Sequence, residues 1–141
     1  MTSQDDFLKN LVEVLGDCSV SYMITGSFGS SLHGHPRATK DVDIVISASE
    51  KQLLKFVQSL GEGYYVSLEA VRDAFASNSM FNIIDNQSGW KADFILRKDR
   101  PFSRREFERK CITNIKGIDF WVTSPEDTIL SKLEWARGSQ P

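Results

Sequence analysis

The sequence has little of what marks secreted or membrane-bound proteins. It contains two cysteines, Cys18 and Cys111, whose separation fits no short metal-binding motif, so we predict free thiols in a reducing compartment. No apolar run approaches the ~20 residues that a membrane-spanning helix needs. The first ten residues, MTSQDDFLKN, lack the basic start and the hydrophobic stretch of a signal peptide. We therefore expect a cytoplasmic protein that is not held at a membrane.

The sequence also lacks internal repeats, low-complexity tracts and a large net charge. The formal net charge is −2, so no overall field attracts nucleic acid or an anionic membrane, and any anion binding must be local. The 141 residues are 40% hydrophobic and 26% charged, which is typical of a soluble globular protein. This length predicts a single domain over residues 1–141.

Hydrophobic periodicity predicts a mixture of helices and strands, and hence an α+β fold with a mixed sheet covered by helices. A first helix is expected to be capped by Asp5 or Asp6 and to end at Gly16, and Ser124 before Pro125 marks the clearest helix start. Residues 64–75 are ambiguous and fit a strand followed by a helix. The other predicted helices are 26–34, one from about Ser49, and 103–111. The predicted strands are 20–25, 41–46, 80–85, 90–96, 111–115 and 118–122.

Two acids interrupt an apolar strand in the segment GSFGSSLHGHPRATKDVDIVI, residues 26–46. Asp41 and Asp43 are two residues apart, so their carboxylates project from the same face of the strand and repel each other. A cation between them would stabilise the pair, and oxygen ligands favour magnesium or manganese. The alternative is a pair of exposed acids on a strand edge, and the pair alone leaves both interpretations open.

The turn before this strand is rich in small residues. At Gly26 and Ser27 backbone N–H groups at a helix start would lie close to an anion such as a phosphate. The alternative is a plain strand–turn–helix connection with Ser27 as the helix cap. Together, a phosphate-binding turn and a carboxylate pair are what a nucleoside triphosphate with its metal ion requires.

A third acid, Asp93, stands alone in the apolar segment WKADFIL. It is the best candidate to complete a two-metal site, in which paired ions stabilise the attacking and leaving oxygens. The alternative is an ordinary acid on an edge strand. The histidines His33 and His35 have no third nitrogen or sulfur ligand nearby, so a zinc site is not expected.

The segment ITGSFGSSLHGHPRATKDVDIVI resembles the signature of the nucleotidyltransferase superfamily, whose palm domain also occurs in DNA polymerase beta. Its long spacing and the HGHPRATKDVD segment are most similar to the small bacterial branch near the AbiEii-type toxin nucleotidyltransferases. The later segment FERKCITNIKGIDFWVTSPEDTILSKLEWA also resembles that branch. The resemblance implies a palm-type mixed sheet.

The resemblance also implies roles for individual residues. Asp41 and Asp43 would ligate two magnesium ions, and Asp93 would ligate the catalytic ion and help to activate the attacking hydroxyl group. Gly26 and Ser27 would hold the β- and γ-phosphates during in-line attack on the α-phosphorus, which releases pyrophosphate. The further nucleotide-binding candidates are Arg37, Thr39 and Lys40, with Lys132 a weaker one.

The implied activity is transfer of a nucleoside monophosphate from a nucleoside triphosphate to a hydroxyl acceptor. The resemblance to the AbiEii-type branch also implies a place in a toxin–antitoxin system. The alternatives are a degenerate, non-catalytic nucleotide-binding or interaction module and a metal-dependent phosphohydrolase. The basic segments RKDR and SRREFERK contain acids. They are therefore expected to be a solvated loop and helix face rather than a nucleic-acid-binding surface. A protein partner or a second copy of the chain is therefore expected to supply the acceptor surface, with a nucleic-acid acceptor left open.

Overall fold

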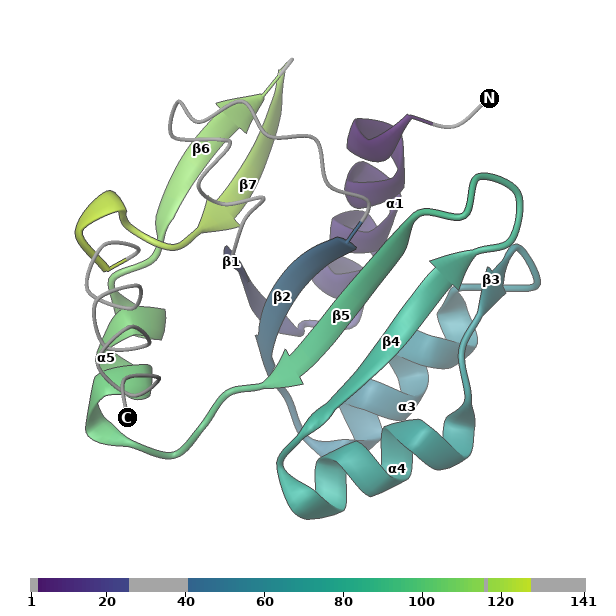
Figure 1. Cartoon of the computed structure of the whole chain (residues 1–141), viewed down its shortest axis with the longest axis horizontal. Coiled ribbons are helices and arrows are strands. Elements are labelled where there is room, and N and C mark those ends of the chain that lie inside the picture. The colour runs from purple at the N-terminus through teal and green to yellow at the C-terminus, as the bar shows by residue number, and fades with distance from the viewer. Residues whose placement is uncertain (1–2, 26–40, 116, 128–141) are drawn as a thin grey trace, which may run out of the picture.

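The computed structural model describes residues 3–25, 41–115 and 117–127. Its helices are α1 (Gln4–Asp17), α3 (Glu50–Ser59), α4 (Leu68–Ser77) and α5 (Pro101–Glu108). Its strands are β1 (Ser21–Thr25), β2 (Asp41–Ser47), β3 (Tyr64–Tyr65), β4 (Met80–Asp85), β5 (Lys91–Leu96), β6 (Cys111–Ile115) and β7 (Ile118–Val122). The predicted α+β class is confirmed, since strands and helices alternate around one mixed sheet (Figure 1).

The strands lie in the order β3-β4-β5-β2-β1-β7-β6. β2 pairs with β5 in parallel, and β1 pairs with β7 in parallel, whereas the other neighbours are antiparallel. The turn at 86–89 and the hairpin between β6 and β7 lie where turn residues predict them, and Gly89 has a φ of 81° that favours glycine. Two strands far apart in sequence, β2 and β5, therefore meet at the centre of the sheet.

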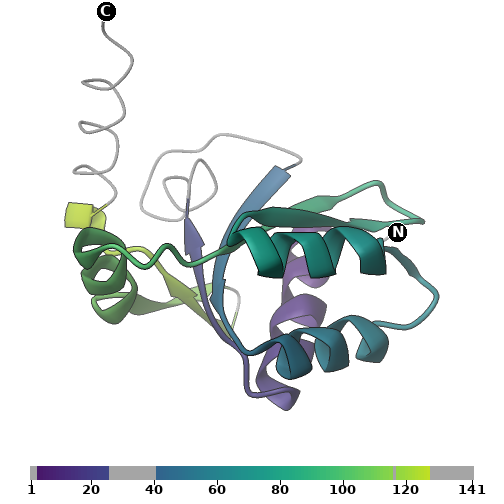
Figure 2. The same ribbon diagram turned by 90° about the horizontal axis from the view of Figure 1, so that it is seen from below.

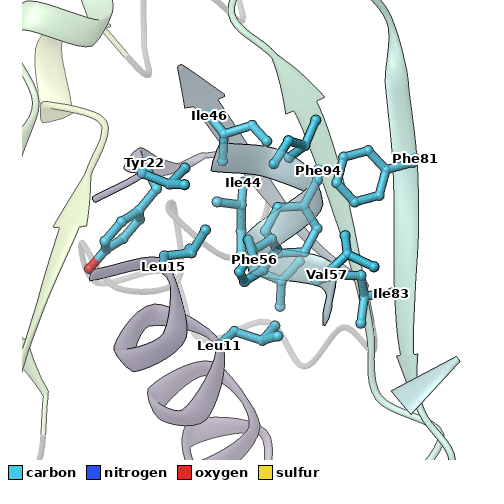
Figure 3. Packing of buried hydrophobic residues seen from close by; sticks show 14 of the residues in the cluster. Leu11, Leu15, Tyr22, Ile44, Ile46, Phe56, Val57, Phe81, Ile83 and Phe94 are labelled. Carbon is cyan, nitrogen blue, oxygen red and sulfur yellow. The ribbon is translucent and has the colours of Figure 1, made fainter. Parts of the chain in front are cut away.

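The hydrophobic core lies between this sheet and the helices α1, α3 and α4. Alternation along β2 buries Val42, Ile44 and Ile46 on the helix side, as a half-covered strand requires. Figure 3 shows side chains of α1 and α3 directed toward those of β2, β4 and β5. The helices α1 and α3 lie on one side of the sheet, and α5 lies near the β6–β7 end (Figure 2).

The helix starts follow simple capping chemistry, with one correction. Ser3, and not Asp5 or Asp6, caps α1, because its side chain accepts a hydrogen bond from the Asp6 N–H at 3.1 Å. The two acids instead lie in the first turn, where they favour the positive end of the helix dipole. The helix continues past Gly16 to Asp17. Ser49 and Gln52 cap α3 reciprocally, which confirms the helix start predicted there.

Several smaller predictions also have outcomes. Cys18 and Cys111 are free thiols, as expected. The helix predicted at 103–111 begins earlier, at Pro101, whose fixed φ suits the first helical position, and it ends at Glu108. Within the described ranges, no helix is long and apolar enough to cross a membrane. The predicted helix at 26–34 lies outside the described residues.

Candidate functional site

The acids predicted from the sequence lie on the sheet face opposite α1, α3 and α4. Since Val42 and Ile44 point to the helices, Asp41 and Asp43 project from the other side of β2. On β5, Ala92, Phe94 and Leu96 are buried, so Lys91 and Asp93 share that other side. We call this the acid face, defined by Asp41, Asp43, Lys91 and Asp93.

The register of the sheet brings Asp43 and Asp93 together. They are direct partners across the parallel β2–β5 pair, so their backbones are neighbours at a strand separation of about 4.8 Å. Thr25 of β1 pairs with Asp43 on one side, and Asn82 of β4 pairs with Asp93 on the other. A polar row therefore crosses four strands, with two carboxylates at its centre.

Lys91 lies next to this row and was not predicted as a site residue. Its ammonium nitrogen is 3.7 Å from Asp41 Oδ2 and 3.9 Å from Asp93 Oδ1. These are ion-pair distances rather than short hydrogen bonds. The three side chains are 33%, 55% and 16% exposed for Lys91, Asp41 and Asp93, so solvent screens the first pair more than the second. Lys91 thus balances part of the negative charge.

Two observations show that Lys91 leaves this charge incompletely balanced. Asp93 Oδ1 is buried, and it accepts no hydrogen bond from the described part of the chain. Burial, followed by the charges of Asp93 and Asp41, raises the pKa of the Asp43 carboxyl, and Lys91 opposes this only in part. A carboxylate cluster with an unmet oxygen and a raised pKa is one that a cation would stabilise.

The donor chemistry of the acid face fits a hard divalent cation. Carboxylate oxygens on adjacent strands suit magnesium or manganese, and no sulfur or imidazole ligand is among the four residues of the acid face. Among residues 3–25, 41–115 and 117–127, however, no group of three or more His, Cys, Asp or Glu side chains is arranged to hold a metal ion. The structure brings the three acids to one face without closing them into a ligand cage.

The other sequence-predicted residues fall outside the described ranges: Gly26, Ser27, Arg37, Thr39, Lys40 and Lys132, together with His33 and His35. Gly26 and Ser27 follow Thr25 directly in the sequence, and Thr25 is the register partner of Asp43. Thr25, Asn82 and Lys91 are the polar residues that sequence reasoning missed. The period of two from Asp93 back to Lys91 was a signal for Lys91, whereas Thr25 and Asn82 needed the register.

Comparison with known proteins gives the fold a family context, although no protein-family model matches the chain. The chain is similar to the lincosamide antibiotic adenylyltransferase LnuA bound to lincomycin, with a TM-score of 0.63 and 18% identity over 92% of this chain and 85% of that one. It is also similar to a protein of Thermotoga maritima proposed to be a nucleotidyltransferase, with a TM-score of 0.57 and 15% identity over 96% and 88% of the two chains. The predicted mixed sheet flanked by helices is therefore a nucleotidyltransferase fold.

One curated sequence also matches over part of its length. Human actin filament-associated protein 1-like 2 is 29% identical over 83 residues, which are 59% of this chain and 10% of that protein. The chain thus spans about a tenth of the length of that protein, and we draw nothing about function from the match.

Proposed function

We propose that this chain is a metal-dependent nucleotidyltransferase, which transfers a nucleoside monophosphate from a nucleoside triphosphate to a hydroxyl acceptor. The observation that carries the proposal is the register pair of Asp43 and Asp93 on the acid face. Two carboxylates at adjacent central positions are costly in an apo sheet unless they serve a cation. The nucleotidyltransferase fold supports the same interpretation.

In this proposal the acids have separate tasks. Asp41 and Asp43 would hold magnesium or manganese, and Asp93 would complete the ligand set and take the proton of the attacking hydroxyl. A bound ion would stabilise the charge that develops on the phosphoryl oxygens. Gly26, Ser27, Arg37, Thr39 and Lys40 remain proposed contacts to the triphosphate. The acceptor oxygen bonds to the α-phosphorus, the bond from this phosphorus to the bridging oxygen breaks, and pyrophosphate leaves.

We extend the proposal to the biological setting and to the source of the acceptor. A place in a toxin–antitoxin pair follows from the resemblance to the AbiEii-type branch alone. A partner protein or a second copy of the chain would supply the acceptor surface. The second candidate function is a non-catalytic nucleotide-binding module, which would use the Asp43–Asp93 pair only to hold the metal ion of the nucleotide, so a transfer assay separates the two functions.

The test is nucleotide transfer by the purified chain. Each of the four α-labelled triphosphates is incubated with magnesium and a mixture of cell RNA, protein and small hydroxyl compounds, and labelled product and pyrophosphate are measured. We expect Asp43→Asn and Asp93→Asn each to lower transfer at least a hundredfold, because electrostatic stabilisation of the transition state is lost. Asp73→Asn, at an exposed position of α4, is the matched control.

Two results would contradict the proposal. One is transfer that continues at the wild-type rate in EDTA, and the other is transfer that the two acid variants leave unchanged. Release of orthophosphate without labelled acceptor would instead favour the phosphohydrolase alternative. Binding of the metal–nucleotide complex with no transfer to any acceptor pool would favour the non-catalytic module.

A further inference from the structure

A second charged feature lies at the far end of β5. A surface hollow of about 540 Å³ is lined by Arg97, Pro101, Arg104, Arg105 and Glu108, and we call it the arginine hollow. Its four α5 residues have the spacing i, i+3, i+4 and i+7, so they share one face of that helix. The segments RKDR and SRREFERK, expected to be a separate solvated loop and helix face, thus contribute to one concave surface.

The arginine hollow has guanidinium donors that residues in the described ranges leave partly unpaired. Its lining has three guanidinium groups and one carboxylate. Arg104 Nε pairs with Asp99 at 3.0 Å, but both side chains are exposed, so the pair is weak and exchangeable. Arg105 Nε donates to the Pro101 carbonyl at 3.3 Å, which leaves the terminal nitrogens of its guanidinium group available for other bonds.

Arg97 gives the most specific indication. Its Nε atom is buried and donates to no acceptor in the described ranges, and such orphaned donors are rare in folded proteins. Its guanidinium carbon lies 5.9 Å from the centre of the Phe107 ring, so the side chain rests over α5 rather than extending freely into solvent. An oxyanion is the natural acceptor for a fixed guanidinium group, and planar guanidinium groups bind phosphate at two points.

The arginine hollow and the acid face belong to one side of the sheet. Arg97 continues the alternation of Asp93 and Ile95, and its N–H donates to the Ile46 carbonyl at 2.9 Å, which extends the β2–β5 ladder. Arg97 lies four positions after Asp93 and directly after β5, or about 13 Å away at the usual rise per residue. The arginine hollow therefore lies beyond the C-terminal ends of β2 and β5.

The opposite direction along β2 leads to Thr25. Gly26 and Ser27 follow Thr25, and Thr25 pairs with Asp43 near the N-terminal start of β2. In an in-line displacement the attacking and leaving oxygens stand on opposite sides of the phosphorus. If the leaving pyrophosphate is held on the Thr25 side of Asp43, attack from the direction of the arginine hollow would satisfy this in-line requirement.

We infer that the arginine hollow binds a phosphate group of the acceptor, and its Arg97 lies about 13 Å along the strand from Asp93. That the bound phosphate belongs to the acceptor rests on the proposed function. That the hollow binds phosphate rests on Arg97, Arg104 and Arg105 alone. The shared chemistry is a phosphate monoester or diester. A nucleic-acid strand ending in a hydroxyl and a small phosphorylated molecule both carry it.

The test measures phosphate binding directly, without a triphosphate or metal. Inorganic phosphate is titrated into the full chain, and calorimetry and the ¹H–¹⁵N resonance of Arg97 Nε report binding. We expect Arg97→Gln and Arg105→Gln each to weaken binding about tenfold, which corresponds to about 1.4 kcal/mol. Arg72→Gln removes the same charge from an exposed position of α4, and this variant should bind phosphate as the wild type does. Circular dichroism and thermal melting verify that each variant is folded.

Binding measurements with larger phosphate compounds identify the class of molecule that carries the phosphate. Binding of a short oligoribonucleotide that is tighter than that of inorganic phosphate, and weakened by Arg97→Gln, indicates a nucleic-acid acceptor. Equal affinity for inorganic phosphate, ribose 5-phosphate and the oligoribonucleotide indicates a small phosphorylated acceptor. Phosphate binding unchanged in both Arg97→Gln and Arg105→Gln overturns the inference. Intact phosphate binding in a chain that binds no magnesium–nucleotide complex contradicts the proposed function and leaves the anion site in place.

Discussion

Asp43 is held in an environment that favours its protonated form. Half-burial in the sheet removes water from its carboxylate, and the neighbouring Asp93 and Asp41 add negative charge, so the pKa of Asp43 lies above its ordinary value of 3.8. Lys91 lowers that pKa in part. A group of this kind lowers the stability of the metal-free protein whenever the pH forces it to ionise.

The variant Asp43→Asn should therefore be more stable than the wild type at pH 7 in EDTA. Because the folded pKa is raised, the folded state holds its proton longer than the unfolded state, and wild-type stability falls as pH rises from 3.8 through the folded pKa. The gain of the variant should grow over that range and then level off, at on the order of 1 kcal/mol. Urea unfolding from pH 4 to pH 8 measures it.

The variant Asp73→Asn, at an exposed position of α4, is the control for the loss of a carboxylate. A stability difference for Asp43→Asn that is constant across the pH range would contradict the environment assigned to Asp43. Added magnesium should reverse the order of stability, since the wild type gains from ion binding and the variant loses a ligand.

Lys91 competes with any cation that approaches the acid face. Replacement by the neutral Lys91→Gln removes an ammonium group 3.7 Å from Asp41 and 3.9 Å from Asp93. We expect magnesium to bind about two- to fivefold more tightly to the variant, as for loss of one partly exposed charge interaction. Calorimetry with magnesium alone measures the affinity, and exposed Lys51→Gln is the control. Unchanged or weaker binding would mean that Lys91 does not compete for these carboxylates.

At the scale of elements, the residues of β5 alternate between the acid face and the hydrophobic core. Asp93 faces the acid face, and the next residue, Phe94, is fully buried in the core. The Phe94 ring is stacked on Phe81 with centroids 5.4 Å apart and is tilted against Phe56 at the same distance (Figure 3). The packing of Phe94 therefore fixes the strand that positions Asp93.

Truncation of this ring should destabilise the whole protein. We expect Phe94→Ala to cost about 3–5 kcal/mol in the free energy of unfolding, because the cavity left between β4, β5 and α3 cannot close fully. Urea unfolding measures the loss. Ile112→Ala, on β6 and 54% exposed, should cost no more than about 0.5 kcal/mol. Similar losses for the two variants would contradict the placement of the core.

Local sequence signals predicted most elements but not their neighbours. Strand alternation, the 86–89 turn and the apolar periodicity of the helix from about Ser49 are short-range patterns, and each predicted its element correctly. The first cap was misassigned because Ser3 and Asp5 are both good capping residues, and the choice depends on where the chain enters the helix. The pairing of β2 with β5 joins residues 50 positions apart, which no local pattern encodes. Thr25 and Asn82 were missed for that reason, whereas Lys91 lies two residues before Asp93 and could have been found from strand alternation.

At the scale of the whole molecule, the sheet is not equally well joined throughout. β2 and β5 are paired from Asp41 and Lys91 to Ile46 and Leu96. The β6–β7 hairpin, in contrast, joins β1 through the pair Ile24 and Val122, with hydrogen bonds from Thr123 to the Ile24 carbonyl at 3.0 and 3.2 Å. Among neighbouring strands in the described ranges, β1 and β7 have the shortest register, so the hairpin is joined to the rest of the sheet over a short stretch.

Hydrogen exchange should reveal this difference. We expect backbone amides of β6 and β7 to exchange at least tenfold faster than those of β2 and β5, because the hairpin can open without unfolding the centre of the sheet. Amide exchange followed by NMR under native conditions measures the rates. Equal protection of Phe120 and Phe94 would show that the sheet opens as one unit. The acid face, built on β2 and β5, would then have no special protection.

The alternation along β2 and β5 places the residues of the core and the acids at different positions of the same strands, so the two sets can change separately in evolution. Even-numbered residues such as Ile44 and Phe94 maintain the core, while odd-numbered ones such as Asp43 and Asp93 carry the acids. Mutations can therefore erase one set during evolution and leave the other untouched. A descendant that lost its acids would keep the same shape, and one that changed its core would keep the same acids. Among descendants of this chain, the odd positions of two central strands are where the proposed activity would be gained or lost.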